Sequence, residues 1–287
     1  MAAQVVVTGA TGAVGAATAE VFAARGLRVV LVSRSADGLA ELAGRIDAAR
    51  TDRDTDRVRV VPVDLSDPGA VRAGAAAIAE GGPVGVLVNC AAIFTGARQT
   101  TVEGRELMFA TNQLGPFLLT NLLRDELAAA HGRVVTVTAP STTRIDFDDL
   151  DAEKSFSALR AFGASKAANL LFTYELARRA APFDVTANAV HPGLIRSDLM
   201  RQAAAPVRLL TRLMSRSPRR AASAIAALGT SGRFLHATGG FYKGTKLASS
   251  SRASRSVDDQ HRLWERCAEL TGLRPDEGFP PTAAAPG

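Results

Sequence analysis

The sequence predicts an α/β fold in which helices cover both faces of a doubly wound parallel sheet of about seven strands. Three observations carry this prediction. Short apolar runs rich in valine and isoleucine alternate with segments of helical period along the 287 residues. Each run is apolar at successive positions, as in strands that are buried on both faces. A glycine-rich turn joins the first run to the first helical segment.

The expected strands and helices alternate along the chain, as in βαβ units. We expect strands at Gln4–Thr8, Arg28–Val32, Val58–Val63, Val84–Asn89, Arg133–Thr138 and Asp184–Val190, with an edge strand near Tyr242. Helices are expected, to within about 2–4 residues at each end, at Gly12–Arg25, Gly38–Ala49, Pro68–Ala79, Val102–Ala129, Leu159–Ala180, Pro218–Gly229 and Ser256–Thr271. Residues 1–273 should form a single domain, and the Pro- and Ala-rich residues 274–287 a flexible tail.

Composition and charge exclude several classes of function. Apolar residues make up 47% of the chain and charged residues 22%, as in ordinary globular proteins. The net charge of +6 comes from scattered arginines without a basic stripe, so we expect no nucleic-acid partner. Cys90 and Cys267 match no metal or redox spacing, and we expect no metal and a reduced, cytoplasmic location. No stretch has the length and apolar character of a membrane span, so no membrane partner is expected.

The glycine turn is typical of a dinucleotide-binding site. Val5-Val6-Val7-Thr8-Gly9-Ala10-Thr11-Gly12-Ala13-Val14-Gly15 reads as a strand, a turn and a helix start. Small residues let the backbone approach a pyrophosphate, whose charge meets the N–H groups and positive dipole of the helix N-terminus. We expect the cofactor to contact Gly9, Thr11, Gly12, Val14 and Gly15. The alternative is a glycine turn that serves only the tight packing of strand against helix.

The end of the second strand favours NADP(H) over NAD(H). An NAD site places an acidic residue about 20 residues after the turn, where it binds the ribose hydroxyls. Ser33 and Arg34 stand there instead. A hydroxyl and a guanidinium suit a 2′-phosphate, and no carboxylate repels it. The alternative is that Arg34 is a solvated surface arginine.

With these residues the chain resembles the short-chain dehydrogenase/reductase family, which has a Rossmann fold. Asp64-Leu65 looks like the pair that contacts adenine, and Asn89-Cys90-Ala91-Ala92 is similar to the Asn-Asn-Ala-Gly stretch of the family. Pro192-Gly193-Leu194-Ile195 resembles the turn whose backbone receives the nicotinamide carboxamide. The resemblance therefore implies cofactor contacts at Asp64, Leu65, Asn89, Ala91, Lys166, Pro192, Gly193 and Ile195.

Further motifs resemble the retinol-dehydrogenase-like branch of that family. They are Phe147-Asp148-Asp149-Leu150, Ser165-Lys166-Ala167-Ala168-Asn169-Leu170-Leu171-Phe172-Thr173 and Arg262-Leu263-Trp264-Glu265. One departure lies in the glycine turn, where most classical members carry a glycine at the position of Ala13. The spacing here follows extended and atypical members.

The usual proton donor of the family is missing. The resemblance implies a Tyr-x-x-x-Lys pair, whose members share a helix face so that the lysine lowers the tyrosine pKa and holds the nicotinamide ribose. Phe162 stands at the tyrosine position and Lys166 is retained. Ala139 stands where the family carries its catalytic serine, and Ser141 is a better substitute than Thr138, which points to the opposite face. Asn112 matches the helix asparagine that holds a proton-relay water, so the catalytic candidates are Lys166, Asn112 and Ser141.

Three functional hypotheses follow from this pattern. The favoured one is an NADPH-dependent ketoreductase whose substrate carries a phenol beside the carbonyl and so stabilises its own alkoxide. The others are a non-catalytic NADP(H)-binding sensor and a non-redox dehydratase or cyclase. The paired loss of serine and tyrosine resembles atypical ketoreductases that tailor angucyclinone polyketides of the simocyclinone type. That resemblance implies a bulky aromatic ketone as the small-molecule partner.

The segment Arg196–Pro218 is expected to form a substrate lid. Apolar residues such as Leu199 and Met200 alternate there with arginines, which would suit a cover over a large planar ligand. The alternative is an amphipathic helix that only packs on the body. The long helices also leave a homodimer open.

Overall fold

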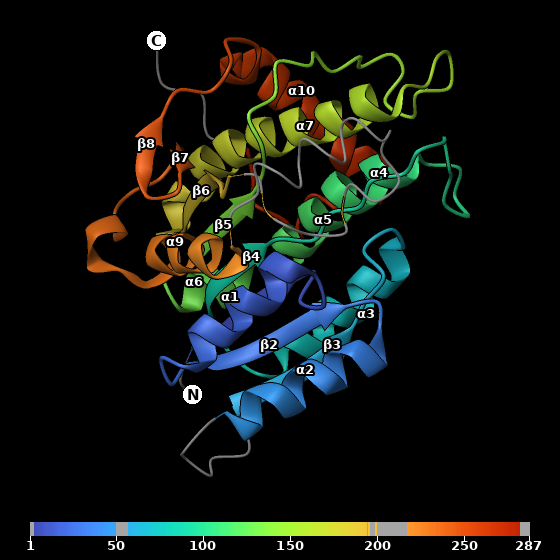
Figure 1. Cartoon of the computed structure of the whole chain (residues 1–287). Helices are drawn as coiled ribbons and strands as arrows, with labels where there is room; N and C mark the ends of the chain where they lie inside the picture. The colour runs from blue at the N-terminus through green and yellow to red at the C-terminus, as the bar shows by residue number, and fades with distance from the viewer. Residues whose placement is uncertain (1–2, 50–56, 194, 196–198, 200–216, 282–287) are drawn as a thin grey trace.

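Eight strands form one sheet in the order β3-β2-β1-β4-β5-β6-β7-β8 (Figure 1). The computed structural model describes residues 3–49, 57–193, 195, 199 and 217–281. The strands are β1 Gln4–Thr8, β2 Arg28–Ser33, β3 Val58–Pro62, β4 Val84–Asn89, β5 Arg133–Val137, β6 Thr186–His191, β7 Gly240–Lys243 and β8 Lys246–Ala248. Neighbours from β3 to β7 pair in parallel, and only β7 and β8 are antiparallel. The predicted doubly wound fold is confirmed, with β8 added to the predicted sheet.

The helices cover the two faces of this sheet. They are α1 Ala13–Ala23, α2 Ala36–Ala48, α3 Pro68–Ala79, α4 Leu107–Phe109, the π-helical turn η2 Ala110–Leu114, α5 Gly115–Leu122, α6 Arg124–Ala129, α7 Ala158–Arg179, α9 Pro218–Thr230 and α10 Val257–Thr271. Single 3-10 turns lie at η3 Ala181–Phe183, η5 Gly232–Phe234 and η6 Ala253–Arg255. One core cluster lies between the sheet and α1, α2 and α9, and the other between the sheet and α3, α5 and α7.

The predicted helix Val102–Ala129 is wrong as a single element. Helical structure begins at Leu107, because the Glu106 carboxylate caps it by accepting hydrogen bonds from the N–H groups of Met108 and Phe109. It then widens into η2 before α5 begins. Pro116 has no N–H to donate to the carbonyl of Asn112, four residues earlier, so the regular α-helical ladder is broken there.

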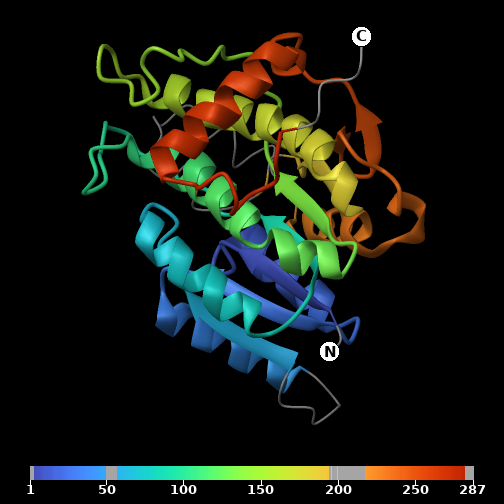
Figure 2. The same ribbon diagram turned by 180° about the vertical axis from the view of Figure 1, so that it is seen from behind.

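The last helix, α10, lies across α7 and α5 on the outer side of the domain (Figure 2). The Trp264 ring packs edge-on against Phe117 and stacks on Phe172, and the Arg179 guanidinium lies 4.5 Å above it. The buried Glu175 pairs with Arg179 within α7 at 2.6 Å. Arg179 also pairs with Glu265 of α10 at 3.2 Å, so one charged network joins the two helices.

The residues after α10 are anchored, so the predicted flexible tail is wrong for residues 274–281. Phe279 is 2% exposed, stacks edge-on with Phe183 and donates its N–H to Oδ1 of Asn121 at 3.0 Å. Glu277 accepts from Arg72 at 2.8 Å. The buried aromatic side chain supplies an anchor that composition alone did not show. Residues 282–287 lie outside the described residues.

Two other predictions concern the substrate lid and membrane-spanning helices. Of the proposed lid Arg196–Pro218, the structure describes Leu199, Ser217 and Pro218 alone, and the remainder lies outside the described residues. Among the helices that are described, none has both the length and the apolar character to cross a bilayer.

Candidate functional site

The carboxyl ends of the parallel strands meet at one edge of the sheet. β1 and β4 are neighbours, but the chain continues from β1 towards β2 on one side and from β4 towards β5 on the other. Doubly wound sheets bind their ligands at this switch in strand order. Thr8 and Asn89 end the two strands, and the predicted cofactor residues follow them.

The glycine turn between β1 and α1 has room for no side chain at two positions. Gly9 has a φ of +65°, and a Cβ there would lie 2.7 Å from Cα of Ala91. A Cβ at Gly15 would lie 2.1 Å from the carbonyl oxygen of Gly9. Gly12 caps α1 without a side-chain hydrogen bond, and the first turn of α1 holds no acidic residue. The N–H groups of this turn, beside Thr11 and Val14, therefore fit an anionic pyrophosphate.

Thr8 holds the glycine turn against the loop after β4. Its Oγ1 accepts hydrogen bonds from the N–H groups of Cys90 at 3.0 Å and Ala91 at 3.2 Å, and donates to the carbonyl of Val88 at 3.2 Å. Asn89 donates to Thr120 at 3.0 Å, while its buried Oδ1 has no partner among the described residues. The sequence interpretation missed Thr8, although a polar residue that ends an apolar strand was a usable signal.

The adenosine end of the site brings Thr11 and Ser33 together. Their hydroxyl oxygens are 2.7 Å apart, and the exposed Arg34 follows Ser33 directly. Asp64 accepts hydrogen bonds from the backbone N–H of Ser66 at 2.9 Å and from its hydroxyl at 2.7 Å. Leu65 is buried. That these residues bind a 2′-phosphate stays a prediction.

Lys166, which is expected at the nicotinamide end of the cofactor site, is 5% exposed on α7. Its Nζ lies 5.4 Å from the centre of the Phe162 ring. Burial lowers the pKa of Lys166 to about 8, against a smaller opposing effect of Cys90. Burial also raises the pKa of the Cys90 thiol to about 12. At neutral pH the site therefore holds an ammonium beside a neutral thiol and an aromatic ring.

Asn112 braces the loop after β4. Its Oδ1 accepts from the N–H of Ile93 at 2.8 Å, and its Nδ2 donates to the carbonyl of Ile93 and to Oγ of Ser165, both at 3.1 Å. Ser165 in turn donates to the carbonyl of Phe162 at 2.8 Å. The side chain of Asn112 is thus fully engaged within the protein, and its part in a proton relay stays a prediction.

The two hydroxyls expected to stand in for the missing serine both bind the backbone of α7. Ser141 donates to the carbonyl of Gly163 at 2.7 Å, and Thr138 donates to the carbonyl of Lys166 at 3.0 Å. A Cβ at Gly163 would lie 2.5 Å from Oγ1 of Thr143, so the loop after β5 packs tightly on the helix. The structure therefore places the Ser141 hydroxyl on the carbonyl of Gly163, the residue after Phe162, with its donor capacity already used. A catalytic part for Ser141 stays a prediction.

An apolar wall surrounds Phe162. Its ring meets Phe94 edge-on, with the ring centres 5.6 Å apart, and the same cluster includes Met108, Phe156 and Leu199. Sequence patterns missed Phe94 and Met108, because neither belongs to a motif and only the fold brings them to Phe162.

Beyond β6, the turn expected to receive the nicotinamide is described in part. Gly193 has a φ of +94°, which glycine adopts readily, and Pro192 precedes it. Ile195 forms an isolated bridge. Leu194 lies outside the described residues.

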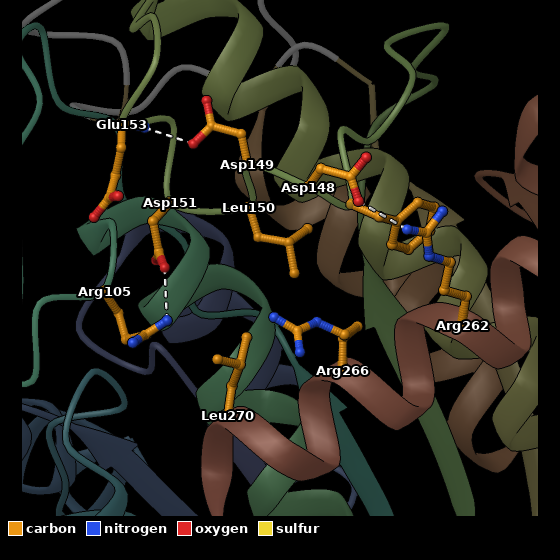
Figure 3. A pocket seen from close by; sticks show the side chains of 10 residues that line it. Arg105, Asp148, Asp149, Leu150, Asp151, Glu153, Arg262, Arg266 and Leu270 are labelled. Atoms are coloured by element: carbon orange, nitrogen blue, oxygen red, sulfur yellow. Dashed lines mark hydrogen bonds and ion pairs between the residues drawn. The ribbon is translucent and has the colours of Figure 1, made fainter.

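A separate cavity of about 490 Å³ lies between the loop after β5 and α10 (Figure 3). Arg105 pairs with Asp151 at 2.6 Å and Arg262 with Asp148 at 3.0 Å along its lining. None of the predicted cofactor or catalytic residues lines this cavity. Its arginines already have carboxylate partners, so the cavity presents little uncompensated charge.

Comparisons with known proteins agree with the fold. A sequence family described as short chain dehydrogenase matches residues 3–207. Retinol dehydrogenase 12 of Homo sapiens is 36% identical over 277 residues, which cover 94% of this chain and 86% of that protein. A crystal structure of a protein from Mycobacterium Paratuberculosis has a TM-score of 0.72 and 29% identity, and covers 97% of this chain and 95% of that chain. A metagenomic short-chain oxidoreductase in complex with NADP shares the fold, with a TM-score of 0.62, 22% identity and coverage of 84% and 96%.

Proposed function

This chain belongs to the short-chain dehydrogenase family of oxidoreductases, and within it we propose an NADPH-dependent ketoreductase of bulky aromatic ketones, such as angucyclinone-like polyketides. The observation that carries the proposal is the site around Lys166. It keeps the buried ammonium and the glycine turn, while Phe162, half-buried and backed by the buried Phe94 and Met108, stands where the family carries its proton-donating tyrosine.

The chemistry divides between cofactor, protein and substrate. NADPH, when bound, supplies the hydride that reduces the carbonyl carbon. Lys166 holds the nicotinamide ribose, and the apolar wall orients a flat ring and excludes water. The carbonyl oxygen takes its proton from the adjacent phenol of the substrate, and the phenolate recovers a proton from water. Such a substrate needs no tyrosine on the enzyme.

The test compares a ketone that carries an adjacent phenol with its phenol methyl ether. We expect NADPH oxidation matched by alcohol formation for the phenol, and a rate lower by roughly 10²–10⁴ for the ether, since an internal acid is lost. Absorbance of NADPH and product mass measure both. Equal rates for the two ketones would contradict substrate-supplied acid. Absence of turnover across a panel of phenolic ketones would favour the sensor hypothesis.

Arg34→Ala tests the preference for NADP(H). We expect NADP⁺ to bind more tightly than NAD⁺ to the wild-type protein, because Thr11, Ser33 and Arg34 suit the 2′-phosphate. The variant should lose roughly 10–100-fold in NADP⁺ affinity and none in NAD⁺ affinity, the effect of removing a charge-assisted hydrogen bond. Calorimetric titration measures both constants. Arg45→Ala, on the outer part of α2, is the matched control. Equal wild-type affinities for the two cofactors would refute the preference.

A further inference from the structure

Asn169 connects the site lysine to the break between α4 and α5. The side chain is 3% exposed and lies one turn after Lys166 on α7. Its Oδ1 accepts from Nζ of Lys166 at 3.5 Å. Its Nδ2 donates to the carbonyl of Asn112 at 2.8 Å and to Oε1 of Gln113 at 3.0 Å. One amide therefore joins the ammonium, the π-helical turn and α7.

The break in the helix fixes the orientation of this amide. Pro116 cannot donate to the carbonyl of Asn112, so that carbonyl is open to Nδ2 of Asn169. Both protons of Nδ2 are used by two acceptors on η2, which leaves Oδ1 facing Lys166. If the amide were flipped, its N–H groups would face the ammonium and its oxygen would face the Asn112 carbonyl and Oε1 of Gln113, and both arrangements are repulsive. The network thus permits a single orientation.

Lys166 has few other polar neighbours. Within the described part of the chain, Oδ1 of Asn169 is the one hydrogen-bond acceptor that Nζ reaches. Cys90, at the end of β4, is the titratable group that faces it, while α7 and η2 contribute amides there. Phe162 presents only its ring. With no tyrosine hydroxyl beside it, the ammonium donates its hydrogen bond to the side-chain amide of Asn169.

We infer that Asn169 is the positioning residue that aims the Lys166 ammonium at the nicotinamide ribose of the bound dinucleotide. The inference rests on the cofactor assignment of the proposed function. It explains why a buried lysine stays in place without a tyrosine hydroxyl beside it. It also couples the nicotinamide end to the loop after β4, since Asn112 braces Ile93 with its side chain and binds Asn169 with its carbonyl.

Asn169→Leu tests the inference with two ligands. NADPH reaches both ends of the site, whereas 2′,5′-ADP carries only the adenosine end. We expect the variant to bind NADPH roughly tenfold more weakly, the effect of one hydrogen bond to a charged group, and to bind 2′,5′-ADP with unchanged affinity. Thr173→Val is the matched control, because Thr173 is buried one turn further along α7 and donates to the carbonyl of Asn169. The control should bind both ligands as the wild type does.

Asn169→Asp supplies a second, nearly isosteric variant. Its carboxylate would stabilise the ammonium of Lys166, although it gives up both donations of Nδ2 to η2. NADPH binding should therefore persist to a higher pH than in the wild type, where the pKa of Lys166 is about 8. The midpoint of NADPH affinity against pH, read by fluorescence titration, should move upward. This variant decides the matter if Asn169→Leu does not fold.

Several results would overturn the inference. They are equal losses for NADPH and 2′,5′-ADP, an unchanged pH midpoint in Asn169→Asp, or unfolding of both variants while Thr173→Val stays folded. None of these measurements needs turnover. If the protein reduces no ketone but Asn169→Leu weakens NADPH binding and leaves 2′,5′-ADP binding unchanged, the role of Asn169 is upheld. If the protein is an active reductase but the variant affects both ligands equally, only the role of Asn169 is overturned.

Discussion

Phe162→Tyr is expected to let the enzyme reduce simple ketones, which carry no adjacent phenol. Their rates should rise roughly 10²–10⁴-fold above those of the wild type, the usual contribution of a general acid. The ring already lies 5.4 Å from Nζ of Lys166, so an added phenol would come under the influence of the ammonium, which favours its ionised form. Turnover of ketones with an adjacent phenol should stay nearly unchanged, because those substrates supply their own proton. Initial rates on matched ketones with and without the phenol measure both effects.

Phe94→Tyr is the control for this gain of function. Phe94 belongs to the same apolar wall and packs edge-on against Phe162, but it lies on the loop after β4 rather than on the helix that carries Lys166. A hydroxyl there should give no new activity on simple ketones. If Phe162→Tyr instead raised the rate on phenolic ketones by orders of magnitude, the substrate would not be acting as its own acid.

Local signals predicted much of the fold. β1, β4 and α3 lie at the predicted residues, since unbroken valine-rich runs mark the two strands and Pro68 begins α3 behind the Asp67 cap. β8 was missed because it is three residues long and largely exposed, with no buried face to impose an alternation. The break at η2 was missed although Pro116, which cannot donate to the carbonyl of Asn112, was a local signal for it. Only the partner that takes this carbonyl, Asn169, lies far away in sequence.

The candidate site divides in the same way. Gly9, Gly12 and Gly15 could be assigned from the sequence because the strand, turn and helix are contiguous, and the turn geometry fits that assignment. Ser141 illustrates the limit. Its separation from Phe162 in the sequence did not predict that its hydroxyl would donate a hydrogen bond to the carbonyl of Gly163. Hydrogen-bond partners of buried polar groups are set by tertiary packing, which a single sequence does not display.

Lys166→Met is expected to stabilise the protein without cofactor while it weakens NADPH binding. Burial lowers the lysine pKa from 10.5 to about 8, so the folded state holds the proton less tightly than the unfolded state. Below pH 8 this difference costs the fold on the order of 3 kcal/mol. Methionine fills a similar volume without a charge, so its variant avoids that cost. We expect a higher Tm for the variant at pH 7 by differential scanning fluorimetry.

The sign of the pH dependence identifies the ammonium as the cause. Between pH 8 and 10.5 the unfolded state binds more protons at Lys166 than the folded state, so wild-type stability rises with pH and the advantage of Lys166→Met shrinks. NADPH affinity should fall by roughly 10–100-fold in the variant, as hydrogen bonds from a charged donor are lost. Lys246→Met, on the exposed strand β8, removes the same charge and should change neither property. A Tm gain that is independent of pH would contradict a cost from burying the Lys166 charge. A variant that binds NADPH as the wild type does would contradict the assignment of Lys166 to the cofactor site.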